Sequence, residues 1–419
     1  MKIIQVISNI SGTGATAYFM TLHHALKELG HDVCVYQFSN MDSLSFGTND
    51  LTIVHKEFNQ ETYDELNSAD IILIEGLPHK KESQEYKDAY LDMIQYHIKT
   101  KKALFIHSHI YASWTRANYS KRIATKDFLL SIDKICGFTP ENQVMKKFAS
   151  IIGKEELEKR FVHILLPHNF SKDLWIDAKD KHKKITYLGR LVRLKDPERL
   201  IKMSGDLWDN NWQIEMRGVV RSIGALGFKN LCYKWDEENQ VMTNEPSELT
   251  CFVTGKTKEK YNVDPEDKNC INLTTNDKQI FVFGRYELKD GLEVMAHHSF
   301  GVDFFNLSTD VYGDTIEYAI YDIVNCGTIP VLDEDMAKDI HLYKDGKRID
   351  KTLFSENAGI FVKKDLSNVN EAIKKMNYLY DNKEEYDKFR NNCYEIYKEF
   401  ADPIEITKNL IEDIKNGRS

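Results

Sequence analysis

Basic residues follow the first apolar run in the second half of the sequence, where they could bind a phosphorylated ligand. Gly189 and Arg190, then Arg193 and Lys195, come after Ile185–Leu188, which we predict to be a strand. Ligands of open α/β sheets bind outside the carboxyl ends of the strands. Arg and Lys placed there could neutralise a diphosphate, and Arg adds paired hydrogen bonds. A solvated basic turn would explain this spacing equally well.

Two acids in a later segment could bind a sugar. Glu317 and Asp322 lie in a stretch that is typical of a helix, followed by Gly327 and the apolar run Ile329–Leu332. A carboxylate accepts two hydroxyl hydrogen bonds at once, which suits the diol of a ribose. Residues five apart do not share one helical stripe, although both could reach an extended ligand. Surface acids on an amphipathic helix are the alternative.

A histidine pair follows a predicted strand of the first half. His107, Ser108 and His109 stand at the end of the apolar run Ala103–His107. Histidine at the carboxyl edge of a sheet could donate to sugar hydroxyls or act as a base. We therefore take these three residues as candidate catalytic groups, with a structural role as the alternative.

A glycine-rich loop follows the first predicted strand and opens the first predicted helix. Gly12 and Gly14 would let the backbone approach a ligand closely, and the free N–H groups of the helix start favour phosphate. The loop also fits the dinucleotide fingerprint, but the second strand ends in Ser39-Asn40 without the acid that holds the ribose. NAD binding is therefore disfavoured, and a plain tight turn remains open.

Basic and aromatic residues alternate just after the histidine pair. Such a cluster could hold a phosphate backbone and stack an exposed base, while a solvated helix face is the simpler explanation. The candidates for nucleic-acid binding are Trp114, Arg116, Lys121 and Arg122.

Composition limits the class of protein. The chain has 419 residues, 42% hydrophobic and 29% charged, which is typical of a globular chain with two domains. The net charge of −9 means that a nucleic-acid partner would need a local basic surface. We expect no membrane span or secretory signal, and the seven scattered cysteines favour a reducing cytosol over disulfides or a zinc site.

Apolar runs alternate with amphipathic segments, which predicts two parallel sheets with helices on both faces. We expect an α/β chain of two Rossmann-like domains, residues 1–170 and 171–400, facing each other across a cleft. Residues 230–278 would be an insertion, and 401–419 a C-terminal helix that returns to the first domain. The predicted strands are Ile3–Ser8, Asp32–Phe38, Leu51–Val54, Ile71–Glu75, Ala103–His107, Ile135–Thr139, Val162–Leu166, Ile185–Leu188, Gln213–Met216, Ile280–Phe283, Val302–Leu307, Ile329–Leu332 and Gly359–Val362; Pro197–Leu207 is predicted to be a helix.

The string Asn325 to Val331 resembles the nucleotide-sugar signature of GT-B glycosyltransferases. Within that fold, the chain resembles the DNA α-glucosyltransferases of T-even phages. The resemblance runs in order from the glycine loop through Leu29 to Val33, the histidine pair, Asn169-Phe170 and Lys195 to this string. It implies a GT-B fold, with the acceptor on the first domain and the nucleotide-sugar on the second.

The resemblance also implies roles for single residues. Asp322 would hold the ribose, although the family residue is usually Glu, and Glu317 would lie close to the donor. Arg190 and Lys195, with Gly189, would bind the diphosphate, and His107 would lie near the transferred sugar. Ser108 stands where the phage enzymes have an acid that is a candidate to activate the acceptor.

The expected function is transfer of a sugar from a UDP-sugar to 5-hydroxymethylcytosine in double-stranded DNA, with retention. Glucose is the default sugar and arabinose the alternative. We expect a monomer in the cytoplasm of an infected bacterium, without a covalently bound cofactor or protein metal ligands; use of a divalent metal stays open. The rivals are a GT-B enzyme with a carbohydrate or lipid acceptor, an NAD-dependent oxidoreductase, and a DNA-binding protein without catalysis.

Overall fold

The computed structural model describes most of the chain. The described residues are 1–7, 13–38, 51–75, 78, 82–106, 120–123, 125–138, 143–189, 195–217, 233–236, 241–246, 270–275, 278–283, 288–304, 317–334, 340–344, 347–351 and 357–416. They form two seven-stranded sheets and two two-stranded sheets, with helices between the strands. The predicted α/β class is therefore confirmed.

The first sheet is parallel throughout, in the order β3-β2-β1-β4-β5-β6-β7. Its central strands are buried on both faces, which explains why they read as continuous apolar runs. The strands are β1 Lys2–Ile7, β2 Asp32–Gln37, β3 Ile53–His55, β4 Ile71–Glu75, β5 Lys102–Ile106, β6 Lys134–Gly137 and β7 Phe161–His163. The predicted strand Val162–Leu166 was wrong in its bounds, because β7 ends at His163 and the chain then leaves the sheet.

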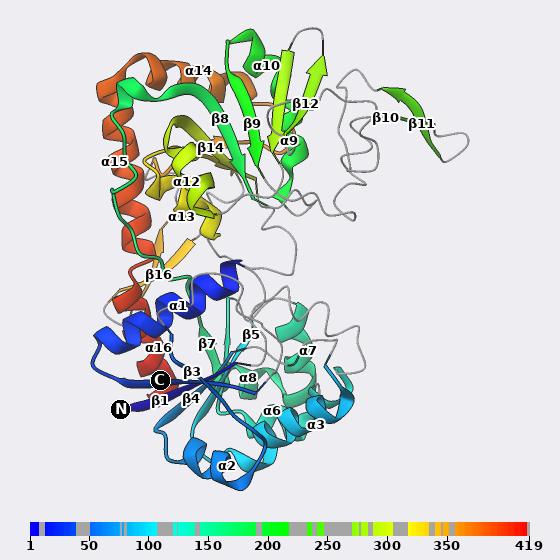
Figure 1. The fold of residues 1–419 in the computed structure, drawn as a ribbon, viewed down its shortest axis with the longest axis vertical. Coiled ribbons are helices and arrows are strands. Elements are labelled where there is room, and N and C mark those ends of the chain that lie inside the picture. Colours follow the sequence, from blue (N-terminus) through cyan, green and yellow to red (C-terminus); the bar gives the residue numbers. More distant parts are fainter. Residues whose placement is uncertain are drawn as a thin grey trace.

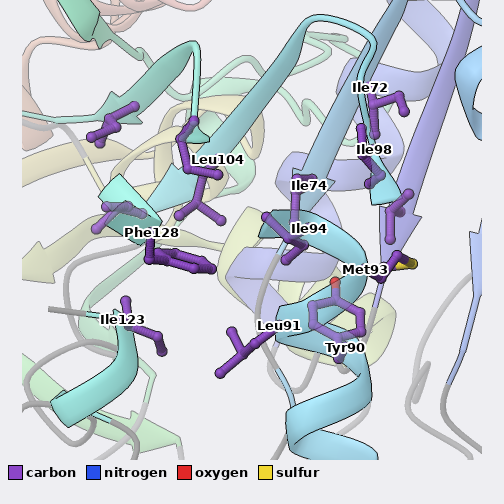
Figure 2. Packing of buried hydrophobic residues seen from close by; sticks show 14 of the residues in the cluster. Ile72, Ile74, Tyr90, Leu91, Met93, Ile94, Ile98, Leu104, Ile123 and Phe128 are labelled. Carbon is purple, nitrogen blue, oxygen red and sulfur yellow. The ribbon is translucent and has the colours of Figure 1, made fainter. Parts of the chain in front are cut away.

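Helices cover both faces of this sheet (Figure 1). They are α1 Thr13–Glu28, α2 Gln60–Asn67, α3 Gln84–Asp92, the π-helix η1 Met93–His97, α5 Ser120–Ile123, α6 Lys126–Ser131, α7 Gln143–Ile152 and α8 Lys154–Arg160. Gly30, with φ 78°, terminates α1, and the His31 N–H donates to the Leu26 carbonyl at 3.1 Å. Figure 2 shows part of one core, in which side chains from α3, η1, α5 and α6 pack with those of β4 and β5: Ile72, Ile74, Tyr90, Leu91, Met93, Ile94, Ile98 (directly after η1), Leu104, Ile123 and Phe128.

The second sheet has the order β12-β13-β9-β8-β14-β15-β18 and is parallel except at its β12 edge. Its strands are β8 His182–Leu188, β9 Gln213–Arg217, β12 Cys270–Thr275, β13 Lys278–Phe283, β14 His298–Asp303, β15 Ile329–Asp333 and β18 Ile360–Val362. Two separate hairpins pair β10 Tyr233–Asp236 with β11 Val241–Pro246, and β16 Ile340–Lys344 with β17 Lys347–Lys351.

Three sequence predictions for this half need correction. The predicted insertion 230–278 extends too far, because residues 270–275 pair with β13 as part of the main sheet. The strand predicted from Val302 begins four residues earlier, at His298. The prediction missed this start because His298 and Ser299 are polar, although both are buried in β14. The single helix predicted over Pro197–Leu207 is two helices, because Ser204 and Gly205 disfavour a helix interior.

The remaining helices complete the second half and connect it to the first. They are the 3-10 helix η2 Ala178–Asp180, α9 Pro197–Lys202, α10 Ser204–Asp209, α12 Leu288–Ala296, α13 Tyr318–Asn325, α14 Val369–Asp381, α15 Lys383–Phe400 and α16 Pro403–Asn416. Helix α15 follows the side of the second half, and after Pro403 the last helix packs on α1 and β7 (Figure 1). Leu410, Ile411 and Ile414 of α16 share a core with Ile3 and Leu22. The C-terminal helix is thus built into the first half of the molecule.

Candidate functional site

Charged side chains gather at the carboxyl edge of the second sheet, where β8 and β14 end side by side. Lys195 forms an ion pair with Glu317, and its Nζ lies 3.8 Å from Oδ2 of Asp303. The Lys195 side chain is only 13% exposed, and that of Asp303 is 3% exposed. The structure therefore places one cation, partly shielded from water, between two carboxylates at the position where α/β sheets bind ligands.

The backbone near this cation is open because Gly189 has no side chain. Gly189 follows β8 with φ 150°, and its N–H donates to the Arg217 carbonyl at 2.9 Å. A Cβ atom there would lie 3.9 Å from Cδ of Lys195 and 3.9 Å from the hydroxyl of Tyr187. The Lys195 side chain therefore lies close to the end of β8.

Glu317 occupies the N-cap of α13, but its side chain makes no capping hydrogen bond. Its carboxylate instead pairs with Lys195, so the start of α13 is linked to the segment that precedes α9. Asp322 lies farther along the same helix, and burial raises the pKa of its carboxyl to about 7, although Lys195 opposes the shift. Of the two acids predicted as donor-binding residues, Glu317 thus contacts Lys195, and Asp322 feels its charge.

Two glycines let α13 pack closely against β14 and against Trp175. Gly301 in β14 faces Ile323 of α13, where an added Cβ would lie 2.7 Å from Cγ1. Gly327, with φ 65°, ends α13, and an added Cβ would lie 2.8 Å from Cγ of Trp175. The glycine of the string from Asn325 to Val331 is therefore needed both for the turn and for the close approach of Trp175.

A buried polar network lies under the carboxyl edge of the first sheet. Gln5 Nε2 donates to Glu75 Oε1 at 3.4 Å, and Gln5 Oε1 lies 2.7 Å from His23 Nδ1. All three side chains are at most 2% exposed, and Oε2 of Glu75 has no hydrogen-bond partner among the residues that the structure describes. Glu75 is not among the site residues predicted from the sequence, because it stands at the end of an apolar run that is typical of a plain strand.

Glu75 should make the stability of the protein depend on pH. Burial raises its pKa to about 8, from 4.5 in the unfolded chain. The folded protein thus keeps a proton that the unfolded chain releases, and the free energy of unfolding falls as pH rises between these values, by at most about 1.4 kcal/mol per pH unit. Glu75→Gln should remove this slope, raising the melting temperature at pH 8.5 with little change at pH 5.

Thermal unfolding across that pH range checks this prediction. The control is Glu158→Gln, which changes a side chain that is 57% exposed and should leave the slope intact. A slope unchanged in the Glu75→Gln protein would show that Glu75 is already ionised at pH 5.

Comparison with known proteins identifies the architecture. No family model and no curated protein matches the sequence. An alpha-glucosyltransferase in complex with UDP-glucose and DNA containing an abasic site is similar in structure, with a TM-score of 0.74, 17% identity and 99% of both chains covered. The UDP and glucose complex of HepE from Anabaena follows at 0.54, with 11% identity and 99% of both chains covered. The chain has the GT-B fold.

The GT-B fold places the two parallel sheets in two successive halves of the chain, as the sequence predicts. Lys195, Gly189, Glu317 and Asp322 come together on the second half. Asp303 joins them, although it was not among the predicted site residues. It lies inside the predicted strand Val302–Leu307, so nothing in the sequence marked it as a site residue.

Several predicted site residues lie outside the described part of this GT-B chain. These are Gly12, His107, Ser108, His109, Trp114, Arg116 and Arg190. Gly14 and Lys121 are described only as members of α1 and α5. Their roles stay predictions.

Arg122 is the one predicted DNA-binding residue whose side chain is described. It pairs with Asp92 and, at 3.3 Å, with Asp88, both on α3. Two carboxylates therefore compensate its charge within the protein. A DNA contact at Arg122 would have to compete with these ion pairs.

Neither a membrane-spanning helix nor a cluster of metal ligands occurs among the described residues of this GT-B chain. None of the helices formed by the described residues is long and apolar enough to span a bilayer. In the same part of the chain, no three His, Cys, Asp or Glu side chains are grouped as metal ligands.

Proposed function

We propose that this protein transfers a sugar from a UDP-sugar to 5-hydroxymethylcytosine in duplex DNA, with retention of configuration. The observation that carries the proposal is the partly buried Lys195 at the carboxyl edge of the second sheet. Open α/β sheets bind ligands outside the carboxyl ends of their strands, and this cation lies at such an edge. Similarity to an alpha-glucosyltransferase bound to UDP-glucose and DNA, over 99% of both chains, supports the substrates.

The chemistry of glycosyl transfer explains why a cation belongs there. The bond from the sugar to the diphosphate breaks through an oxocarbenium-like state, so negative charge grows on the leaving diphosphate. Lys195 would stabilise that charge, and Arg190 would add paired hydrogen bonds. Asp322 would accept the ribose hydroxyls, and His107 would lie near the transferred sugar.

DNA as acceptor requires that the target base leaves the stack, because its hydroxymethyl group is otherwise out of reach. Trp114, Arg116, Lys121 and Arg122 are the residues that we propose for DNA binding. A protein that makes several phosphate contacts loses affinity steeply as salt rises. The proposed setting is the cytoplasm of an infected bacterium, with the protein acting as a monomer.

The second candidate is a GT-B enzyme with a carbohydrate or lipid acceptor. The net charge of −9 favours it over a polyanionic acceptor. A glycosyltransferase involved in avilamycin A biosynthesis is also similar in structure, with a TM-score of 0.50, 11% identity and coverage of 99% of this chain and 97% of that one.

Mass spectrometry of digested nucleosides separates the two candidates. The protein is incubated with duplex DNA that contains hydroxymethylcytosine and with a panel of UDP-sugars; matched DNA with plain cytosine is the control. A gain of one hexose or pentose, on the modified base alone, is the expected result. No gain with any donor, from a protein that binds UDP, would reject the DNA acceptor and favour the carbohydrate or lipid acceptor.

A further inference from the structure

The residue after Lys195 has a backbone conformation that L-amino acids rarely adopt. Asp196 has φ 39° and ψ 48°, in the left-handed region. It precedes α9, yet its carboxylate makes no capping hydrogen bond to that helix. Strained residues of this kind persist only where the surroundings hold them, and they cluster at functional sites. Some other group must therefore hold Asp196.

Arg199 is that group. Its Nε and Nη2 donate to Oδ2 of Asp196, at 2.9 and 2.8 Å. The Arg199 side chain is 2% exposed, so water does not compete for these hydrogen bonds. Two donors on one planar guanidinium fix the position of the carboxylate, and with it the turn that follows Lys195.

The other side of Arg199 is anchored to the sheet. Its Nη1 lies 2.5 Å from Oδ2 of Asp333 and 3.3 Å from the carbonyl oxygen of Val362. The guanidinium also lies 4.7 Å from the ring centre of Phe304. Asp333 and Val362 end β15 and β18, and Phe304 directly follows β14. Arg199 thus connects the carboxyl ends of three strands to the turn that carries Lys195.

We infer that Arg199 is a positioning residue, which holds the left-handed turn at Asp196 and thereby aims Lys195 at the diphosphate of a bound UDP-sugar. This inference rests on the proposed function. Arg199 itself is too buried to touch a ligand. Its effect passes through Lys195, because displacement of a binding group by about 1 Å is enough to change its interaction strongly.

Calorimetric titration with UDP and with uridine tests the inference. Arg199→Lys keeps the charge but loses the planar fork, so the Kd for UDP should rise at least about tenfold. The Kd for uridine, which has no diphosphate, should stay within about twofold of the wild-type value. Equal weakening of both ligands would mean a purely structural role and would overturn the inference.

A pair of variants at Asp196 tests the turn without changing Arg199. Glycine adopts the left-handed conformation freely and alanine does not, so Asp196→Ala should weaken UDP binding more than Asp196→Gly. In the glycine background, the added Arg199→Lys change should cost less than about threefold. Equal Kd values for the alanine and glycine variants would overturn the inference even if Arg199→Lys failed to fold.

Arg390→Lys is the matched control, because Arg390 is also buried and pairs with a carboxylate, that of Asp387, but lies on α15. Its UDP affinity should match that of the wild type. In a double-mutant cycle with Lys195→Met, the Arg199→Lys change should add no further loss, and full additivity would contradict the inference. Failure of the wild-type protein to bind UDP would reject the proposed donor together with this inference; UDP binding unaffected by Arg199→Lys would reject the inference alone.

Discussion

Replacing Lys195 with methionine should lower kcat/KM for the UDP-sugar at least about a hundredfold. Methionine keeps much of the length of the side chain but removes the cation that we assign to the diphosphate. Negative charge on the leaving group grows in the transition state, so kcat should fall more than KM rises. The loss should be large because the Lys195 side chain is only 13% exposed, and water screens its charge poorly.

Initial rates across a range of donor concentrations measure both constants. Lys56→Met is the matched control, since Lys56 is similarly shielded, at 18% exposed, and also pairs with a glutamate, Glu65. It lies next to β3 in the first half, far from Lys195 in the sequence, and its kcat/KM should remain close to that of the wild type. An unchanged kcat/KM in the Lys195→Met protein would remove Lys195 from the site.

Gly327→Ala should lower the melting temperature by about 5–10 °C. Alanine in the left-handed region costs about 1–2 kcal/mol, and Gly327 has φ 65°. The added Cβ would also lie 2.8 Å from Cγ of the Trp175 ring, which is pinned by a hydrogen bond to the carbonyl of Asn325. Crowding of a packed core adds about 1–3 kcal/mol.

Differential scanning calorimetry measures this effect, and Gly205→Ala provides the control. Gly205 is in α10, has ordinary helical geometry, and an added Cβ would meet nothing within 4 Å. Alanine there should leave the melting temperature equal or slightly higher, because it favours a helix. A Gly327→Ala protein as stable as Gly205→Ala would mean that the turn and the Trp175 contact can relax at little cost.

Local pattern in the sequence determined the elements and their order. Parallel strands buried on both faces, such as Ile71–Glu75, are continuous apolar runs bounded by polar segments. Gly30 ends a helix because glycine readily adopts the left-handed conformation, which is a local property of the residue. Alternation of such runs with helices implies parallel sheets, so the α/β class and both Rossmann-like halves could be predicted. The strand bounds were predicted wrongly where a buried strand contains polar residues, as at His298 and Ser299. Hydrogen bonds to the distant strand β8 satisfy these side chains, and the hydrophobic pattern of the sequence does not reveal such bonds.

Only the tertiary structure decided which charges meet. The partners of Lys195 include Asp303 and Glu317, more than a hundred residues away, and those of Arg199 include Asp333. Nothing in the sequence around Lys195 distinguishes it from a lysine in a solvated turn. The order of strands in the sheet brings β8, β14, β15 and β18 side by side, and this places their carboxyl ends and the start of α13 together. A charge buried at that edge is stable only next to an opposite charge. The three-dimensional position of these side chains, more than their residue types, therefore makes the cluster a candidate site.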